Sequence, residues 1–235
     1  MIDIQPIASS SAGNAYLITD GTTMLLLEAG VRFRDIQRAT GFRTSLISAC
    51  LLTHEHLDHS RYAVDVMRAG IDVYASHGTL EAAGLTGHRA ITFAALVPVK
   101  IGTWTILPFD VQHDVSEPYG FFLANAAGDK LLFATDTYYI RHRFAGLTHI
   151  MVECNYSQRI LDDNVAAGRI DAGRRKRTMR SHFSLENVLE FLAANDLRRV
   201  EEIHLMHLSD ANSDEAAFKL AVQAATGKPV YVAQR

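Results

Sequence analysis

The sequence predicts a mixed α/β fold, and three features of the chain support this prediction. Short apolar runs recur and are bounded by glycine, asparagine or aspartate, as strands are in globular proteins. Stretches with helical periodicity follow several of these runs. The two halves are similar in kind, because each begins with strands and continues with strand–helix units. This order predicts one pseudo-duplicated domain over residues 1–235, with two mixed sheets facing each other and helices outside them.

The first half is expected to consist of short strands joined by turns. Strands are predicted over residues 1–8, 15–18, 23–27, 46–53 and 71–75. The first three strands are separated by the polar cluster at 9–14 and by the dipeptide Asp20-Gly21. Helices are predicted over 35–40, 61–69 and 79–83, and each is followed by a glycine: Gly41, Gly70 and Gly84.

The second half begins with hairpin-like strands and then alternates strands with helices. Its predicted strands cover residues 103–107, 109–111, 119–124, 130–134, 150–154, 200–205 and 230–232. A helix is expected over 184–195, with Ser184 as its N-cap. The last helix is expected over 213–226, where Gly227 and Pro229 end it.

Composition places the chain among ordinary water-soluble globular proteins. It is 48% hydrophobic and 21% charged, and its net charge of -3 exerts no general attraction on nucleic acid or membranes. No signal peptide and no membrane span is evident, so a cytoplasmic protein without a membrane partner is expected. Cys50 and Cys154 lie in apolar runs, which favours buried, reduced thiols over a disulfide.

One six-residue run after a predicted strand is rich in metal-ligand side chains: His54, Glu55, His56, Leu57, Asp58 and His59. Imidazole and carboxylate groups together suit Zn²⁺, Mn²⁺ or Fe²⁺. The spacing excludes the helical H-E-x-x-H motif, because Asp58 stands where the second histidine is required. We therefore expect these side chains to converge from a loop or strand end and to bind metal.

Three further ligand-type residues follow predicted strands later in the chain: His113, Asp136 and His207. An H-x-H-x-D-H run followed in order by His, Asp and His resembles the metallo-β-lactamase superfamily, and the resemblance covers nearly the whole chain. It implies a four-layer αβ/βα sandwich with two metal ions at one edge of the paired sheets. The implied ligands are His54, His56 and His113 for one ion, Asp58, His59 and His207 for the other, and Asp136 as the bridge.

Four segments narrow the resemblance to the phosphodiesterase branches. They are residues 9–18, 113–120, 134–137 and 207–213, and the last is similar to a motif of small single-domain bacterial and phage 5′-3′ exonucleases. The branch implies a DNA exonuclease that uses hydroxide activated by two metal ions, with Asp58 and Asp136 as catalytic residues. Glu28 departs from the family, which usually has Asp there, although Glu should still reach the metal ligands from behind.

A basic segment and a histidine lie outside the implied ligand set. Residues 159–180 carry seven basic side chains and three acids, a local charge of about +4. They lead directly to His182, which the resemblance places beside the scissile phosphate as a catalytic residue. A solvated surface loop and a packing histidine are the simpler alternatives. The expected substrate-binding residues are Arg174, Arg175, Arg177, Arg180, His182 and Ser209.

The expected substrate is nucleic acid, with DNA ahead of RNA. The alternative is a small-molecule hydrolase of the same fold, acting on a cyclic phosphodiester, lactone, thioester or β-lactam, but such an enzyme needs no basic segment. Di-iron reductases of this fold carry Glu where this chain has His56, and add a flavin domain. A binding module would be expected to lack a ligand, and none is missing. The sequence leaves the oligomeric state open, a dimer included.

Overall fold

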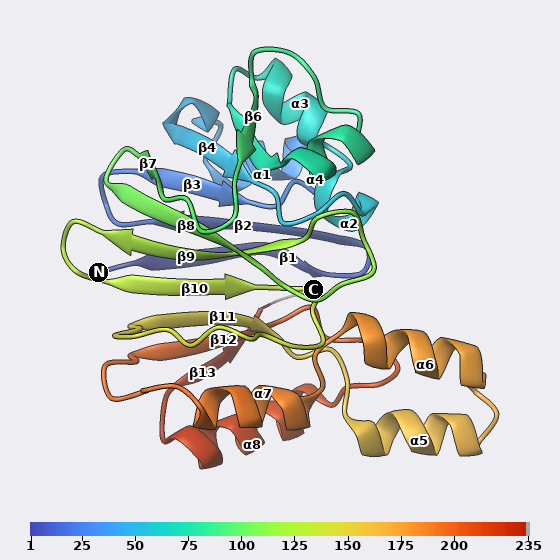
Figure 1. The fold of residues 1–235 in the computed structure, drawn as a ribbon. Helices are drawn as coiled ribbons and strands as arrows, with labels where there is room; N and C mark the ends of the chain where they lie inside the picture. Colours follow the sequence, from blue (N-terminus) through green and yellow to red (C-terminus); the bar gives the residue numbers. More distant parts are fainter. Residues whose placement is uncertain (234–235) are drawn as a thin grey trace. The chain divides into compact units, whose positions relative to one another are not determined.

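Residues 1–233 are the part of the chain that this computed structural model describes, and they form both strands and helices (Figure 1). The strands fall into two sheets with helices beside them, so the predicted mixed α/β class is confirmed. The chain packs as two compact units. The first unit comprises Met1–Asp110 and Val115–Asp129, and the second comprises Val111–Asp114 and Lys130–Ala233. The assignment of residues 1–235 to a single domain stays a prediction.

The first unit is built on a six-stranded sheet with the strand order β1-β2-β3-β4-β5-β6. The strands are β1 (Asp3–Ser10), β2 (Gly13–Thr19), β3 (Met24–Leu27), β4 (Ile47–Leu51), β5 (Val73–Ser76) and β6 (Ala90–Phe93). β1, β2 and β3 pair antiparallel, whereas β3 to β6 pair parallel. The change follows from the connections, because tight turns join the first three strands and helical crossovers separate β3, β4 and β5.

Helices of the first unit are short: α1 (Phe33–Ala39), the 3₁₀ helix η1 (Thr44–Leu46), α2 (Leu57–Ser60), α3 (Ala63–Arg68) and α4 (His77–Ala82). Ile36 of α1, Val66 of α3 and Leu80 of α4 join one apolar core with strand residues such as Leu26 and Cys50. This core fixes the end of β4, from which the first group of ligand residues leaves.

Three antiparallel strands complete the first unit: β7 (Val99–Ile101), β8 (Trp104–Asp110) and β9 (Tyr119–Asn125). The sequence predicted a break in β8 at Pro108, but the strand runs through it. β7 pairs only with Trp104–Ile106 of β8. Pro108, which has no N–H group to donate, therefore lies beyond the segment of β8 that pairs with β7. β6 and β7 were not predicted, because their short sequences carry little apolar alternation.

The second unit holds parallel strands in the order β13-β12-β11-β10. They are β10 (Lys130–Ala134), β11 (His149–Glu153), β12 (Glu202–Met206) and β13 (Val230–Val232). All five residues of β11 are buried, as expected for a parallel strand covered on both faces. The carboxyl ends of parallel strands share one edge, so residues that follow β10, β11 and β12 come close together.

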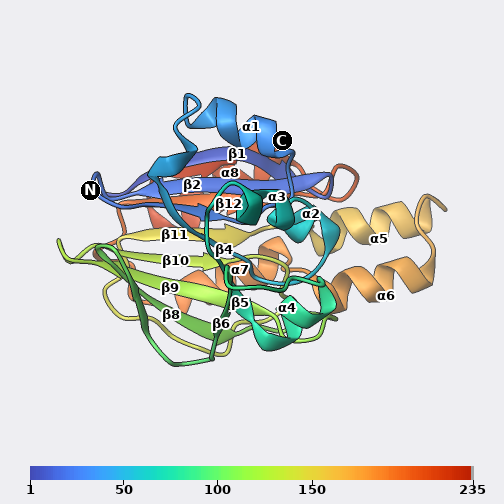
Figure 2. The same ribbon diagram turned by 90° about the horizontal axis from the view of Figure 1, so that it is seen from above.

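Four helices belong to the second unit: α5 (Gln158–Ala166), α6 (Ala172–Ser181), α7 (Leu185–Ala193) and α8 (Glu215–Thr226). Figure 1 shows α7 and α8 beside β12 and β13. Ser184 caps α7 as predicted, and its side chain accepts from the Asn187 N–H at 3.1 Å. In Figure 2, α5 and α6 lie side by side and extend past the strands of this unit. The sequence indicated only a basic segment there, because α6 has few apolar residues to reveal its periodicity.

Cys50 and Cys154 are each buried and free, which confirms the expected thiols. Within residues 1–233, no helix has the length and apolar composition that crossing a membrane requires.

Candidate metal centre and catalytic site

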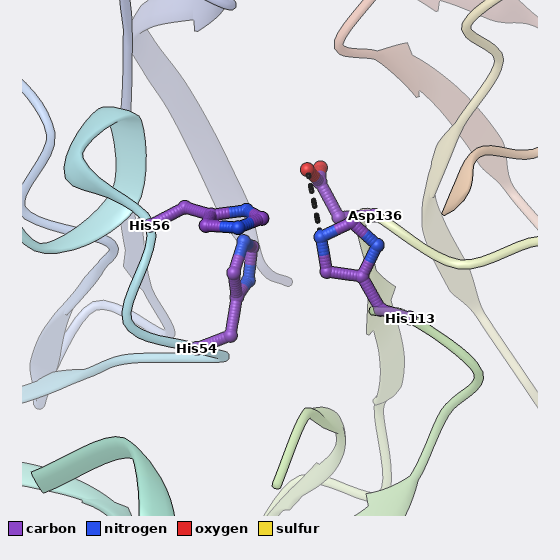
Figure 3. Close-up of side chains that lie close together, drawn as sticks. All are labelled: His54, His56, His113 and Asp136. Atoms are coloured by element: carbon purple, nitrogen blue, oxygen red, sulfur yellow. Dashed lines mark ion pairs between the residues drawn. The ribbon is translucent and has the colours of Figure 1, made fainter. Parts of the chain in front are cut away.

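The first group of ligand-type residues lies where the chain leaves β4. His54 and His59 are buried, while His56 is exposed at the N-cap of α2. The ring of His54 lies 4.9 Å from that of His56 and 4.2 Å from that of His59, measured between centroids. Figure 3 shows His54 and His56 with their rings adjacent. His54 and His56 come from an extended segment, as the spacing predicted, whereas Asp58 and His59 lie on the single turn of α2, which the spacing did not predict.

Glu28 supports this group from behind. Its side chain is completely buried, and it accepts a 2.6 Å hydrogen bond from the Thr53 hydroxyl. Glu28 Oε1 lies 3.5 Å from His59 Nδ1, and the Thr53 hydroxyl lies 2.9 Å from His54 Nδ1. The longer Glu side chain therefore reaches the ligand rings, and contacts of this kind fix the orientation of metal-binding imidazoles. Glu28 has a positive φ of 64°, a conformation that non-glycine residues adopt rarely.

The first group also depends on a close backbone approach. Asn14, in the serine-rich segment, is buried and its amide nitrogen lies 3.3 Å from the Asp58 carbonyl and 3.2 Å from His59 Nε2. The Gly30 N–H donates to the Asn14 carbonyl at 2.9 Å. A Cβ atom on Gly30 would lie 1.7 Å from the Asp58 carbonyl oxygen, so only glycine fits between Asn14 and α2.

The second unit brings together its own three predicted ligands, which are His113, Asp136 and His207. Asp136 follows β10 and His207 follows β12, and His207 Nδ1 lies 2.6 Å from Asp136 Oδ1. His113 Nε2 lies 3.8 Å from Asp136 Oδ2, the ion pair drawn as a dashed line in Figure 3. Asp136 and His207 both have positive φ, at 46° and 52°. Strained backbone of this kind concentrates at functional sites.

Glu153, which sequence reasoning did not single out, lies at the centre of this cluster. Its Oε1 lies 2.6 Å from His182 Nδ1 and 3.2 Å from His207 Nδ1. Its Oε2 accepts from the backbone N–H groups of Thr137 and Phe183, each at 3.1 Å. Each of the four cluster residues offers a ligand atom within 4.8 Å of the others: Asp136, Glu153, His182 and His207.

The charges in this cluster shift one another's pKa values. Burial opposes ionisation of Glu153, but His182 and the hydrogen bonds that Glu153 accepts lower its pKa below the usual value. Burial likewise opposes protonation of His182, yet Glu153 raises its pKa above the ordinary imidazole value. For His207, Asp136 and Glu153 outweigh burial and raise the pKa to about 10. Metal binding there must release a proton, because the imidazole binds a cation only when neutral.

A signal for Glu153 was present in the sequence. An acidic residue near the end of the apolar strand predicted over 150–154 needs hydrogen bonds or an opposite charge if the strand is buried. Glu153 is completely buried. The neighbouring Asn155 is a second missed residue, whose amide donates to the His207 carbonyl at 2.8 Å. Side chains of this kind hold ligands in place, and sequence spacing alone does not reveal them.

The basic segment forms the helix pair α5 and α6. Among residues 1–233, the side chains of Arg174, Arg177 and Arg180 form no ion pair, and all three are exposed. Arg175 differs, since its Nε lies 2.7 Å from Asp162 of α5 and ties the two helices together. The Ser209 hydroxyl accepts from Asn212 at 3.3 Å. Substrate binding by these residues stays a prediction, and for Arg175 a structural contact is also present.

Histidines without a predicted role lie outside the ligand groups. His204 lies 3.0 Å from Glu202 and stacks on Tyr231, with ring centroids 5.2 Å apart. His149 Nε2 lies 3.8 Å from the same Glu202 carboxylate. Both imidazoles thus lie near the same carboxylate, outside the ligand groups.

The donor chemistry of the two groups fits divalent cations. Each unit supplies imidazoles together with at least one carboxylate, and most of these side chains are buried. Mixed nitrogen and oxygen donors suit Zn²⁺, Mn²⁺ and Fe²⁺, and do not distinguish among them.

Comparisons with known proteins identify the family. The sequence profile described as beta-lactamase superfamily domain matches residues 23–207. A search of curated proteins gives no match. Among solved structures, the metallo-β-lactamase fold protein YhfI from Bacillus subtilis has a TM-score of 0.74 at 16% identity, covering 100% of this chain and 97% of that chain.

Two further structures are similar over the whole of this chain. A diphosphatase of the PhnP family has a TM-score of 0.69 at 14% identity, covering 100% of this chain and 95% of that chain. Human tRNase Z, short form, has a TM-score of 0.65 at 12% identity, covering 100% of this chain and 96% of that chain. At such identities the likeness concerns the fold, whereas the profile match extends over most of the sequence. The chain therefore has the metallo-β-lactamase fold and belongs to the metallo-β-lactamase superfamily.

Proposed function

We propose that this chain is a metal-dependent phosphodiesterase that hydrolyses nucleic acid. Its preferred substrate is DNA rather than RNA, and it cleaves from the end of a strand. Family membership supports the coarser statement, a hydrolase of the metallo-β-lactamase fold. The observation that carries the finer proposal is His182, held at 2.6 Å by the buried Glu153 and placed directly after the arginine-bearing helix α6. A hydrolase of neutral small molecules needs neither feature.

The proposal assigns two divalent ions, Zn²⁺, Mn²⁺ or Fe²⁺, to the seven implied ligands. His54, His56 and His113 would hold one, Asp58, His59 and His207 the other, and Asp136 would contribute to both. Bound ions of this kind supply an activated water and stabilise negative charge on a phosphoryl group. Glu28 and Asn14 then act as supports that keep the first ligand group in place.

His182 acts on the substrate through its remaining ring nitrogen. Nδ1 is engaged by Glu153, which leaves Nε2 as the atom that can donate to a phosphate or leaving oxygen. The carboxylate of Glu153 also favours the protonated imidazole, as a proton donor requires. The His182 side chain is 23% exposed, so a substrate can reach it.

Helix α6 supplies the contact to the substrate backbone. Arg174, Arg177 and Arg180 are exposed and their side chains form no ion pair among the described residues, so phosphates can reach their charge, although that of Arg174 also lies near Asp171. The last turn of α6 leads into His182, which joins backbone binding to the proposed chemistry. DNA is placed ahead of RNA because residues 207–213 resemble the motif of small 5′-3′ exonucleases.

The alternative is a small-molecule hydrolase, and one structurally similar protein is a diphosphatase. One gel and one colour assay separate the candidates. The purified chain, loaded with Mn²⁺ or Zn²⁺, is incubated with 5′-phosphorylated single- and double-stranded DNA, with RNA and with a chromogenic β-lactam. Stepwise shortening of DNA supports the proposal. Turnover of the β-lactam alone, or of no nucleic acid in either metal, contradicts it.

A further inference from the structure

The second unit contains a cavity that the proposed chemistry does not use. Its volume is about 230 Å³, and it lies between the segment 139–143 and helix α7. The residues that matter for its chemistry are Tyr139, Arg143, Phe183, Asn187, Glu190 and Phe191. Pockets for drug-sized ligands occupy roughly 300–1,000 Å³, so this one suits a single ring system.

The wall of the cavity is held at both ends. The Tyr139 N–H donates to the Thr137 hydroxyl at 3.3 Å, and the Phe144 N–H donates to Asn195 Oδ1 at 2.9 Å. In between, the Asn187 amide donates to the Tyr138 carbonyl at 3.3 Å, which links the segment to α7. The cavity is therefore preformed, and a ligand that enters it does not have to order the segment first.

The lining combines aromatic faces with polar groups at the rim. Phe183 and Phe191 are buried and form an apolar floor, whereas Tyr139 is 56% exposed. Exposed Arg143 supplies a positive charge, and exposed Glu190 supplies an acceptor carboxylate. A flat aromatic ring with exocyclic amino groups fits these surroundings, because it can stack on Tyr139 while its amines donate to Glu190.

The cavity is continuous in sequence with the catalytic cluster. Phe183 directly follows His182, and the Phe183 N–H donates to Glu153 at 3.1 Å. Tyr139 lies three residues after Asp136, beyond Thr137, whose N–H also donates to Glu153. Both segments that leave the cluster thus contribute residues to the lining, and Phe183 of the lining is the direct chain neighbour of His182.

We propose that this cavity binds the nucleobase of a nucleotide adjoining the scissile phosphate, by stacking on Tyr139 over the floor of Phe183 and Phe191. The inference rests on the proposed function, since it names a subsite of that same phosphodiesterase. The cavity should accept any base, because stacking uses the π-face that every base presents. It should prefer bases that carry an amino group, which can donate to Glu190.

The test compares two ligands that differ only in the base. Isothermal titration calorimetry measures the binding of adenosine 5′-monophosphate and of ribose 5-phosphate to the metal-loaded chain. Wild type should bind the nucleotide more tightly. Tyr139→Ala should reduce nucleotide affinity roughly 5- to 150-fold, the range that stacking of a base on an aromatic ring supplies. Its affinity for ribose 5-phosphate should not change.

Tyr231→Ala is the matched control, because Tyr231 is 48% exposed, belongs to the same unit and lies outside the cavity lining. It should bind both ligands like wild type. Equal wild-type affinity for the two ligands, or equal nucleotide binding by Tyr139→Ala and wild type, overturns the base subsite. Hydrolysis of methyl p-nitrophenyl phosphate, which has no base, separately tests the phosphodiesterase. If the chain hydrolyses this ester but binds the two ligands equally, the proposed function stands and only the base subsite is contradicted.

Discussion

His182 Nδ1 lies 2.6 Å from Oε1 of Glu153, a carboxylate that is completely buried at the end of β11. The other oxygen of Glu153 accepts two backbone N–H groups, so the carboxylate cannot rotate away from the imidazole. This arrangement fixes both the ring orientation of His182 and the nitrogen that carries its second proton. The same carboxylate oxygen lies 3.2 Å from His207 Nδ1, so it links His182 to one of the implied metal ligands.

Replacing His182 with alanine should lower kcat without removing metal. The expected loss is roughly 10²–10⁴-fold on DNA if His182 protonates the leaving oxygen. It should shrink for bis-(p-nitrophenyl) phosphate, because p-nitrophenolate leaves without a proton. Metal content by atomic emission and thermal unfolding serve as the controls. Loss of metal would make His182 a ligand or its support, and full activity on DNA would make it a packing residue.

Glu153→Gln should act through His182. The substitution keeps the size of the side chain but removes the charge that raises the pKa of His182, so the acidic form is populated less near neutral pH. We expect a fall in kcat and a shift of the alkaline limb of the pH–rate profile to lower pH. In the double variant with His182→Ala, the second substitution should add little further loss. Independent, additive losses would show that Glu153 does not work through the imidazole.

Metal stoichiometry tests the ligand assignment. The metal-replete chain should contain two divalent ions, and Asp136→Ala should abolish hydrolysis because this carboxylate is proposed to contribute to both sites. The same variant should retain less than the full complement of metal after dialysis. The measurement is emission spectroscopy on dialysed samples, with His204→Ala as a control that removes an imidazole outside the ligand groups. One ion per wild-type chain would contradict the two-metal proposal.

Charge removal on α6 should weaken substrate binding and leave the chemistry intact. The triple variant of Arg174, Arg177 and Arg180 to alanine should lose affinity for DNA and show a flatter dependence on salt. Each lost phosphate contact reduces the slope of log K against log salt by about 0.9 on duplex DNA. Arg175 is left in place because its contact with Asp162 joins α6 to α5.

The control for this variant removes exposed arginines from the first unit, with Arg34 and Arg43 changed to alanine. It should bind DNA with an unchanged salt slope. Turnover of bis-(p-nitrophenyl) phosphate should stay nearly constant in both variants. An equal loss of DNA and small-ester turnover would mean that α6 has a structural role.

The ligand-type residues could be singled out because each follows a short apolar strand, whereas their assignment as metal ligands comes from the family resemblance and stays a prediction. Glu153 was harder to recognise, since its role depends on Thr137, His182 and Phe183, which are distant in sequence. The helices α5 and α6 were read as a charged segment because α6 has few apolar residues. The apolar cluster that joins Leu161 of α5 and Met179 of α6 brings together residues that are distant in sequence. β8 was divided at Pro108, since local rules cannot reveal that the neighbouring strand stops short of the proline.

Gly30→Ala should disrupt the first ligand group although Gly30 is no ligand. The added methyl would lie 1.7 Å from the Asp58 carbonyl oxygen and 2.7 Å from the Asn14 nitrogen. Both are backbone atoms, so α2 or the Asn14 turn must shift, at a cost of roughly 1–3 kcal/mol or more. We expect a lower melting temperature and weaker metal retention. Gly173→Ala on α6 is the control, since its Cβ would meet only the Asp171 side chain, at 3.0 Å, and alanine favours a helix. If Gly30→Ala retains wild-type stability and metal, the approach of Gly30 to α2 does not position Asp58 and His59.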